Sequence, residues 1–413
     1  MAEIRRNSPE ILAPAGDRER LEAALFYGAD AVYLAGKAYG MRSASRNFDE
    51  EGLAAAVRLA HAHGSRVYVT CNTLPRNAEM DRLPAFLQAV QAAGADALII
   101  CDLGVMAMAR RYAPDCRLHV STQFGVMNYQ TTNALWEYGA SRVVLARELS
   151  LEEIAMIREK TSPELELECF VHGAMCASLS GRCFLSGYLT GRDANHGNCA
   201  QPCRWKYRVI PDGMPETVLT AEEYAQGTYL FNANDLCMIE HIPALVRAGI
   251  TSFKIEGRAK AAYYAAVTTN AYKSAVAGYL AAPDPDSYQP PAWIRRELDT
   301  ISHRPYGTGF FFGTPQQNTA FGGYVQDYEV AAVVEGWKAG RLYLSQRNFF
   351  QRGDTLEVLE PGKPPVSLTA EEMLDADGGA IDAARHPLMV LSVRGEKAFL
   401  PGSFVRRRVP DKK

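Results

Sequence analysis

The sequence predicts an α/β chain whose first part is a TIM-like (β/α)8 barrel, followed by a small C-terminal antiparallel β-barrel domain. Three observations predict this fold. A unit of helix, glycine and short apolar strand recurs through residues 1–280, eight strands can be counted there, and the composition changes after a proline-rich stretch at 281–291. Alternating helices and strands form parallel sheets covered by helices, and eight such strands close into a barrel.

Glycines mark the predicted helix ends, because glycine suits the left-handed position just past a helix. The five glycines that precede a short apolar run are Gly28, Gly64, Gly94, Gly139 and Gly249. Asp17 is the expected cap of the first helix. No G-x-G-x-x-G run follows the first strand, so the open, dinucleotide-binding alternative lacks its fingerprint. The strands are predicted near 11–13, 31–35, 66–70, 97–101, 117–121, 142–146, 165–172 and 252–256.

The sequence predicts a folded protein, and we expect it in the cytosol. The chain has 413 residues, of which 47% are hydrophobic and 22% charged, enough for two globular domains. The amino terminus lacks a signal-peptide pattern, and no apolar run reaches the ~18 residues of a membrane helix, so no membrane association is expected. The net charge of -3 neither favours nor excludes a nucleic-acid partner.

In a barrel of this kind the chemistry lies where the strands end at their carboxyl side. The polar residues at the predicted strand ends are therefore candidates from topology alone. They are Asn72, Asp102, Gln123, Arg147, Glu148, His172, Glu256 and Arg258.

A cysteine-rich insertion at about 173–240 separates the last two predicted strands, so it is expected to cover the same end of the barrel. Connections this long are usually functional. In the reducing cytosol, clustered cysteines indicate metal or redox chemistry before disulfides, and nearby arginines favour thiolates. The spacing of Cys199 and Cys203 suits zinc, but no second close pair completes a zinc ribbon. Inert buried thiols are the alternative, and they are the preferred interpretation for the strand cysteines Cys71, Cys101, Cys116 and Cys169.

Several motifs resemble those of the U32 peptidase family. They are HGAMC at 172–176, SGRC at 180–183, TGRDAN at 190–195, CAQPCRWKY at 199–207, ILAPAG at 11–16, GADAVYL at 28–34, STQ at 121–123 and KIEGR at 254–258. The similarity extends through the whole chain and is greatest to the tRNA hydroxylation proteins of the family. The sequence holds no H-E-x-x-H or G-x-S-x-G protease motif.

The resemblance implies hydroxylation of the wobble uridine in the tRNA anticodon loop, at ring carbon five, in a process that depends on prephenate. It also implies a 4Fe-4S cluster, because related proteins carry one on four cysteines. Their spacing carries over best to Cys176, Cys183, Cys199 and Cys237, with Cys203 as the spare or as an alternative ligand.

Prephenate carries two carboxylates, so Arg192 and Arg258, with their planar fork of donors, are candidate clamps. The alternative is that each arginine only pairs with a nearby acid, such as Arg258 with Glu256. Glu256 is a candidate base, or it orients that arginine. His172 is a candidate proton carrier, or it hydrogen-bonds a loop carbonyl.

Amide and aromatic side chains are candidate contacts to the RNA base. Gln123 and Asn72 suit a base edge or a hydroxyl, or they satisfy loop backbone groups. Trp205 and Tyr207 suit stacking on an extruded base, or they pack the cysteine loop.

The remainder is predicted as a linker and helix at 281–305, with the helix around 293–301, and a small β-barrel at 306–413. In the family this tail resembles the second domain of translation elongation factors. Its last residues form a basic end that suits phosphates or is merely solvated: Arg406, Arg407, Arg408, Lys412 and Lys413. Two other functions stay open, a peptidase and a non-catalytic, zinc-stabilised scaffold that binds RNA.

Overall fold

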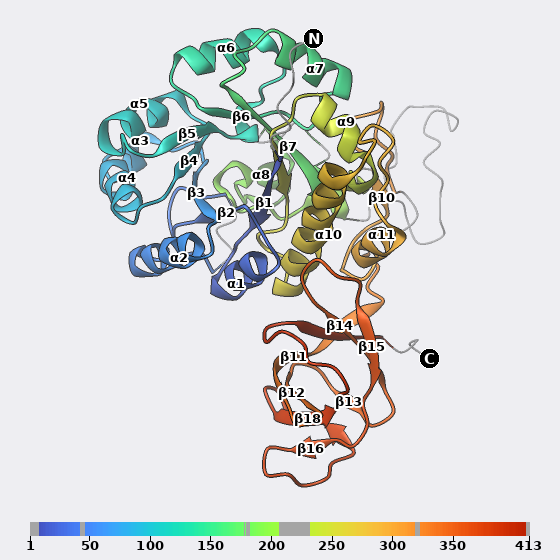
Figure 1. Ribbon diagram of the computed structural model, residues 1–413. Helices are drawn as coiled ribbons and strands as arrows, with labels where there is room; N and C mark the ends of the chain where they lie inside the picture. The colour runs from blue at the N-terminus through green and yellow to red at the C-terminus, as the bar shows by residue number, and fades with distance from the viewer. Residues whose placement is uncertain are drawn as a thin grey trace, which may run out of the picture.

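The computed structural model describes residues 8–41, 46–176, 178, 182–205, 232–318 and 323–409. Figure 1 shows two parts, a ring of strands surrounded by helices and, beyond α10 and α11, a domain made of strands. No helix in the described part of the chain has the length and apolar character of a membrane span.

The first part is a closed barrel of eight parallel strands, as predicted. Each strand pairs with the next, and the last strand pairs with both β7 and β1, which closes the ring. The strands are β1 (Glu10–Pro14), β2 (Ala31–Ala35), β3 (Arg66–Cys71), β4 (Ala97–Ile100), β5 (Arg117–Val120), β6 (Arg142–Val144), β7 (Glu166–Gly173) and β9 (Ser252–Ile255).

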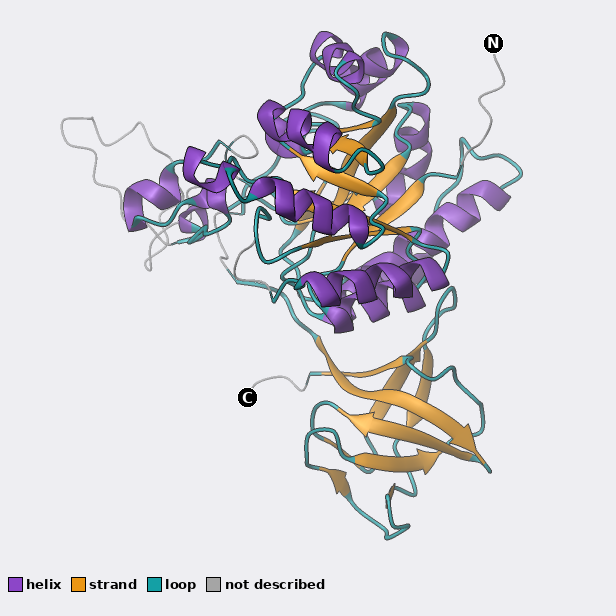
Figure 2. Ribbon diagram, turned by 90° about the vertical axis from the view of Figure 1, so that its left-hand side faces the viewer, coloured by secondary structure: helices purple, strands orange, loops and turns teal. Residues whose placement is uncertain are grey.

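Helices cover the outside of the ring, as Figure 2 shows. Several begin at side chains that accept a hydrogen bond from the first turn, among them Asp17, the predicted cap, and Asp102 at the end of β4. Asp102 therefore starts a helix. The helices are α1 (Arg18–Phe26), α2 (Glu50–Ala62), α3 (Asn77–Met80), α4 (Leu83–Ala92), α5 (Leu103–Tyr112), α6 (Tyr129–Glu137), α7 (Leu151–Glu159), α9 (Ile242–Arg247) and α10 (Ala262–Ala281).

Buried charges fill the inside of the ring. Arg142 contacts the carboxylates of Glu10, Glu166 and Glu168 at 2.6–2.9 Å, and Lys254 contacts Glu168 at 2.7 Å. Burial alone would raise the pKa of Glu168, but Lys254 and Arg142 hold it below its usual range. Paired in this way, the charges avoid the cost of an isolated ion in the interior.

The cysteine-rich insertion starts at the end of β7 and returns through β8 (Asp235–Cys237), which pairs antiparallel with β7. β8 in turn pairs with β10 (Tyr306–Gly307), and isolated bridges join Ala233 to Gln317 and His303 to Val325. These pairings join Tyr306, Gly307 and Gln317 to the barrel domain. The preceding segment holds α11 (Ala292–Leu298).

The second domain is an antiparallel half-barrel with its own apolar core. Its seven-stranded sheet stays open, because the edge strands β15 and β16 do not pair with each other. The antiparallel prediction is confirmed. The strands are β11 (Tyr328–Lys338), β12 (Arg341–Gln346), β13 (Phe350–Gln351), β14 (Thr355–Leu359), β15 (Val366–Thr369), β16 (Leu374–Asp375), β17 (Ala383–Ala384), β18 (Val390–Arg394) and β19 (Phe404–Arg408).

The predicted basic end is wrong for two of its arginines. Arg406 is 1% exposed and contacts Glu297 of α11 and Glu357 at 2.7 Å. Arg407 pairs with Glu329 and Asp354. Both are held by carboxylates, so they offer no phosphate site. Lys412 and Lys413 lie outside the described residues.

Candidate active site

A cavity of about 360 Å³ lies at the carboxyl ends of the barrel strands, between the ring and the insertion. This volume is in the ~300–1,000 Å³ range of small-molecule sites. Apolar groups from the strands, including Tyr33, Ile99 and Phe170, form part of the lining. Four cations also line it: Arg147, Arg182, Lys254 and Arg258.

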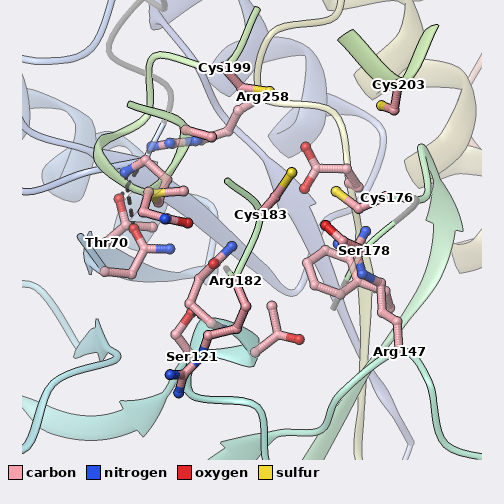
Figure 3. Close-up of a pocket in the computed structure, with 18 of the residues that line it drawn as sticks. Thr70, Ser121, Arg147, Cys176, Ser178, Arg182, Cys183, Cys199, Cys203 and Arg258 are labelled. Atoms are coloured by element: carbon pink, nitrogen blue, oxygen red, sulfur yellow. Dashed lines mark hydrogen bonds between the residues drawn. The ribbon is translucent and has the colours of Figure 1, made fainter. Parts of the chain in front are cut away.

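Four cysteines of the insertion line this same cavity: Cys176, Cys183, Cys199 and Cys203. Figure 3 shows these four cysteines with other residues of the lining, among them Arg258, whose side chain reaches Thr70. Burial raises the pKa of Cys203, and the three other thiols raise it further, while Arg204 lowers it. The structure therefore brings together three of the four predicted ligands, with Cys203 as the fourth cysteine.

Local hydrogen bonds hold the described part of the insertion in place. The buried hydroxyl of Ser186, on α8 (Leu185–Thr190), donates to the Arg192 carbonyl at 2.9 Å and accepts from the Ala200 amide at 3.0 Å. His196 contacts Asp193 at 3.0 Å and Glu79 of α3 at 3.3 Å. These contacts anchor the cysteine-bearing loop to the barrel mouth.

One feature of this loop fits a thiolate that ligates a metal. Gln201 has a left-handed φ of 57°, and its amide donates a hydrogen bond to the Cys199 sulfur at 3.3 Å. Hydrogen bonds to cysteine sulfurs tune iron–sulfur clusters, and backbone strain of this kind gathers at functional sites.

The arrangement does not suit a single metal ion. Among the described residues, no three histidine, cysteine, aspartate or glutamate side chains are placed to hold one. Four sulfurs around one zinc ion stand about 3.8 Å apart, because each Zn–S bond is about 2.3 Å long. Four cysteines are the ligand number of a 4Fe-4S cluster, so the donor set of this cavity fits one.

Cys237, which the resemblance implied as a ligand, does not line this cavity. It lies on β8 opposite His172 and is absent from the cavity lining. Its surroundings include Tyr272 of α10 and Arg295 of α11, and burial raises its pKa to about 11. Side chains alternate along a strand. Its neighbour Leu236 faces Gly309, so Cys237 points to the other side.

Arg258 is buried at the cavity wall and donates a hydrogen bond to the Thr70 hydroxyl at 3.2 Å. Glu256 also lines the cavity. Its carbonyl lies so close to Gly173 that an added Cβ would stand 2.5 Å away, and Gly173 has a φ of 108°. A glycine at the end of β7 therefore lets the Glu256 backbone approach.

The two amide candidates also lie in the lining. Asn72 accepts a hydrogen bond from the Met41 amide at 3.1 Å, so it satisfies a loop as well. Gln123 follows Ser121, whose hydroxyl accepts from the Gln123 amide. Arg147 joins them, with its guanidinium 5.2 Å from the ring centroid of Phe170.

His172 lies outside the cavity lining, which corrects its predicted role as a proton carrier there. Its ring is 1% exposed and packs against Tyr264, Tyr272 and Tyr306. Burial lowers its pKa to about 3, so it is neutral at physiological pH. The position of His172 therefore matches neither alternative from the sequence, a proton carrier in the cavity or a side chain that hydrogen-bonds a loop carbonyl.

Arg192 lines a second, wider cavity beside the first, and its Nε donates to Asn198. It is absent from the lining of the first cavity. Trp205 is 43% exposed and lines neither cavity. Tyr207 lies outside the described residues. Glu148 faces a small third cavity.

Sequence reasoning missed two of the four cations of the first cavity, Lys254 and Arg182. Lys254 belongs to the KIEGR motif, but it lies inside β9 and not at a strand end, so topology did not single it out. Its Nζ lies 4.8 Å from the ring centroid of Tyr33 and bonds Glu168. Arg182 precedes Cys183, a predicted ligand, and this position in the sequence could have marked it as a residue of the site.

The four strand cysteines are buried, as predicted. Burial raises the pKa of Cys116 to about 11 and that of Cys101 to about 12. The pKa values of Cys71 and Cys169 are raised for the same reason. These thiols stay protonated and act as core.

The fold and the site define a (β/α)8-barrel protein whose cysteine-bearing insertion covers the catalytic end of the barrel. Residues 16–320 match Peptidase family U32, and residues 326–406 match the Peptidase family U32 C-terminal domain. The chain belongs to peptidase family U32, as its motifs indicated.

Named relatives are similar over most of the chain. The "tRNA hydroxylation protein P1" of Bacillus subtilis (strain 168) is 39% identical over 405 residues, 97% of this chain and 94% of that protein. The "tRNA hydroxylation protein P" of Escherichia coli (strain K12) is 34% identical, over 91% of each chain. The "23S rRNA 5-hydroxycytidine C2501 synthase" of the same organism is 35% identical over 64% of this chain and 38% of that protein.

Proposed function

We propose that this chain is an RNA hydroxylase, and specifically that it converts the wobble uridine of tRNA to 5-hydroxyuridine with an iron–sulfur cluster and prephenate. Relatives with matching names support RNA hydroxylation. The observation that carries the proposal is that one cavity at the barrel mouth joins four cysteines to cations, amides and an apolar floor.

The pyrimidine enters the cavity in an extruded form, because an enzyme that acts on a base must take it out of the stack. The apolar side chains Tyr33, Ile99 and Phe170 contact the base face. The amides of Asn72 and Gln123 hydrogen-bond its edge, since an amide offers both a donor and an acceptor.

The cluster is held by Cys176, Cys183, Cys199 and Cys203 in this proposal, and the Gln201 amide supports the Cys199 thiolate. A bound 4Fe-4S cluster supplies one-electron transfer next to the base. Arg182 and Arg258 offset the negative charge of the thiolates, because both line the same cavity.

The carboxylates of prephenate pair with cations of the cavity. Arg258 is fixed by Thr70 and Arg147 by the Ala174 carbonyl, so their donor forks are held in place before the ligand arrives. Arg192 lies in the neighbouring cavity and is replaced in this role by Arg147. Glu256 is the one carboxylate among the described lining residues, and it is the candidate base.

The test is nucleoside analysis of tRNA by mass spectrometry. Cells that lack the chain should lose 5-hydroxyuridine, and the wild-type chain should restore it. Cys183→Ser and Arg258→Gln should fail to restore it, whereas Arg58→Gln, an exposed change on α2, should succeed. Normal 5-hydroxyuridine in the cells that lack the chain would overturn the proposal.

A peptidase remains the second candidate because the family carries that name. The site argues against it. No described residue of the cavity lining is a histidine, so none of its cysteines or serines has a histidine base within the lining. Cleavage of an unfolded protein by the pure chain, abolished by Cys183→Ser, would favour the peptidase.

A further inference from the structure

A second cavity, here called the cationic groove, adjoins the proposed active site. It has a volume of about 660 Å³ and shares Cys199, Glu256 and Arg258 with the first cavity. The shared residues form the wall between the two spaces. A ligand in the groove therefore lies next to the pyrimidine base that is proposed to react in the first cavity.

The groove concentrates positive charge on a chain whose net charge is -3. Six cations face three carboxylates, those of Asp17, Glu19 and Glu256. Arg20 is partly neutralised, since it donates to Asp17 and to the Lys260 carbonyl. The cations are Arg20, Arg46, Arg192, Arg204, Arg258 and Lys260.

Tyr324 lines the groove and contacts two of its cations. The Lys260 ammonium lies 3.9 Å from the centroid of its ring, and its hydroxyl accepts a hydrogen bond from Arg204 Nη1 at 2.8 Å. Arg204 Nε is buried and has no hydrogen-bond partner among the described residues. A buried donor without an acceptor costs free energy, so it indicates a ligand that supplies the acceptor.

We propose that the cationic groove binds the phosphodiester backbone beside the extruded nucleotide of the RNA substrate, with Arg204 and Lys260 as phosphate contacts. Cations aligned along a groove track a nucleic-acid backbone, and an exposed aromatic ring beside them stacks a neighbouring base. Tyr324, which is 38% exposed, is placed for that stacking. The six cations outnumber the three carboxylates of the groove, and this excess of positive charge along one surface favours an anionic backbone.

This inference rests on the proposed function, and tRNA binding tests it without hydroxylation. Affinity of the full-length chain for a tRNA transcript should be measured against salt concentration. Each phosphate contact adds ~0.7 to 0.9 to the slope of log affinity against log salt. Arg204→Gln and Lys260→Gln should each lower the slope by about that amount, and Lys260→Arg should restore it.

Arg58→Gln is the matched control, because Arg58 is exposed on α2, outside both cavities. It removes one positive charge and should leave the slope unchanged. Unchanged melting temperatures would show that the variants fold. Arg204 and Lys260 are both half-buried, so each variant is an independent test if the other fails to fold.

The two proposals fail differently. If the wild type binds tRNA but the groove variants keep the wild-type slope, the groove assignment is overturned and the hydroxylase proposal stands. If the wild type binds no tRNA, both are overturned.

Discussion

At the scale of single residues, the cysteines give the sharpest test of the metal site. Cys203 lines the cavity with three other cysteines, whereas Cys237 lies apart on β8. We therefore expect Cys203→Ser to lose the bound iron and the brown colour after anaerobic purification, because a hydroxyl is a poor replacement for a thiolate ligand. Cys237→Ser should keep both.

Iron content and the visible absorption spectrum measure this difference. The reverse pattern, with iron lost only from Cys237→Ser, would return the ligand set to the one that family spacing predicted. A colourless wild type that contains zinc would remove the cluster altogether.

Lys260 provides a prediction about pH. Burial lowers its pKa to about 8, helped by Arg204 and Arg304 and opposed by Asp235 and Glu256. The ammonium is therefore charged below pH 8 and largely neutral at pH 9. If it contacts a phosphate, tRNA affinity should fall between pH 7 and pH 9, by up to about tenfold.

Lys260→Arg is the control for this effect, because a guanidinium stays charged across the whole interval. Its affinity should be flat over the pH range in which that of the wild type falls. Parallel curves for the two proteins would exclude Lys260 as the titrating group.

The residue scale is also where sequence reasoning was weakest. It placed Asn72, Gln123, Glu256, Arg258 and three cysteines correctly in one cavity, since strand ends and the insertion share one end of a barrel. Cys237, His172, Arg192 and Trp205 lie outside the lining of that cavity. Spacing along the chain does not say which face of a short strand a side chain occupies, and that face separates Cys237 from the cavity.

At the scale of elements, the glycine pattern predicted the helix ends well. All five glycines have positive φ values, from 73° at Gly64 to 96° at Gly139. β8 and β10 were missed, because strands of three and two residues are too short to show an alternating pattern. In the structure β8 pairs with β7, and β10 pairs with β8.

The end of β7 gives a prediction at this scale. An alanine at position 173 meets a left-handed φ, which costs ~1–2 kcal/mol, and the Glu256 carbonyl, where overpacking adds ~1–3 kcal/mol. Gly173→Ala should therefore lower the free energy of unfolding by the sum and also reduce hydroxylation, because it displaces Glu256. Urea denaturation and a hydroxylation assay measure the two effects.

Gly64→Ala is the matched control. Gly64 has a φ of 73°, but no atom lies within 4 Å of an added Cβ. Only the conformational cost applies at this position. Gly64→Ala should therefore lower the free energy of unfolding by less than Gly173→Ala does, and hydroxylation should be unchanged. Equal losses at the two positions would show that the close approach to Glu256 does not matter.

At the scale of the whole molecule, the two domains are joined by a buried polar contact. Arg406 of β19 contacts Glu297 of α11 through both of its terminal nitrogens, and each side chain is 1% exposed. It also donates to Tyr263 and Thr300 of the barrel domain. The sequence offered no sign of this, because the partners are 109 residues apart and a terminal run of arginines usually faces water.

Glu297→Gln tests how firmly this contact holds the domains together. The change leaves the Arg406 guanidinium buried without that countercharge, and breaking a buried ion pair in this way costs about 3–5 kcal/mol. Glu372→Gln is the matched control, because Glu372 and its partner Arg394 are 59% and 57% exposed, and surface pairs contribute at most about 1 kcal/mol. In urea denaturation Glu297→Gln should lose several times more stability than Glu372→Gln. Similar losses would mean that Glu357, the second carboxylate on Arg406, is enough to neutralise the buried guanidinium.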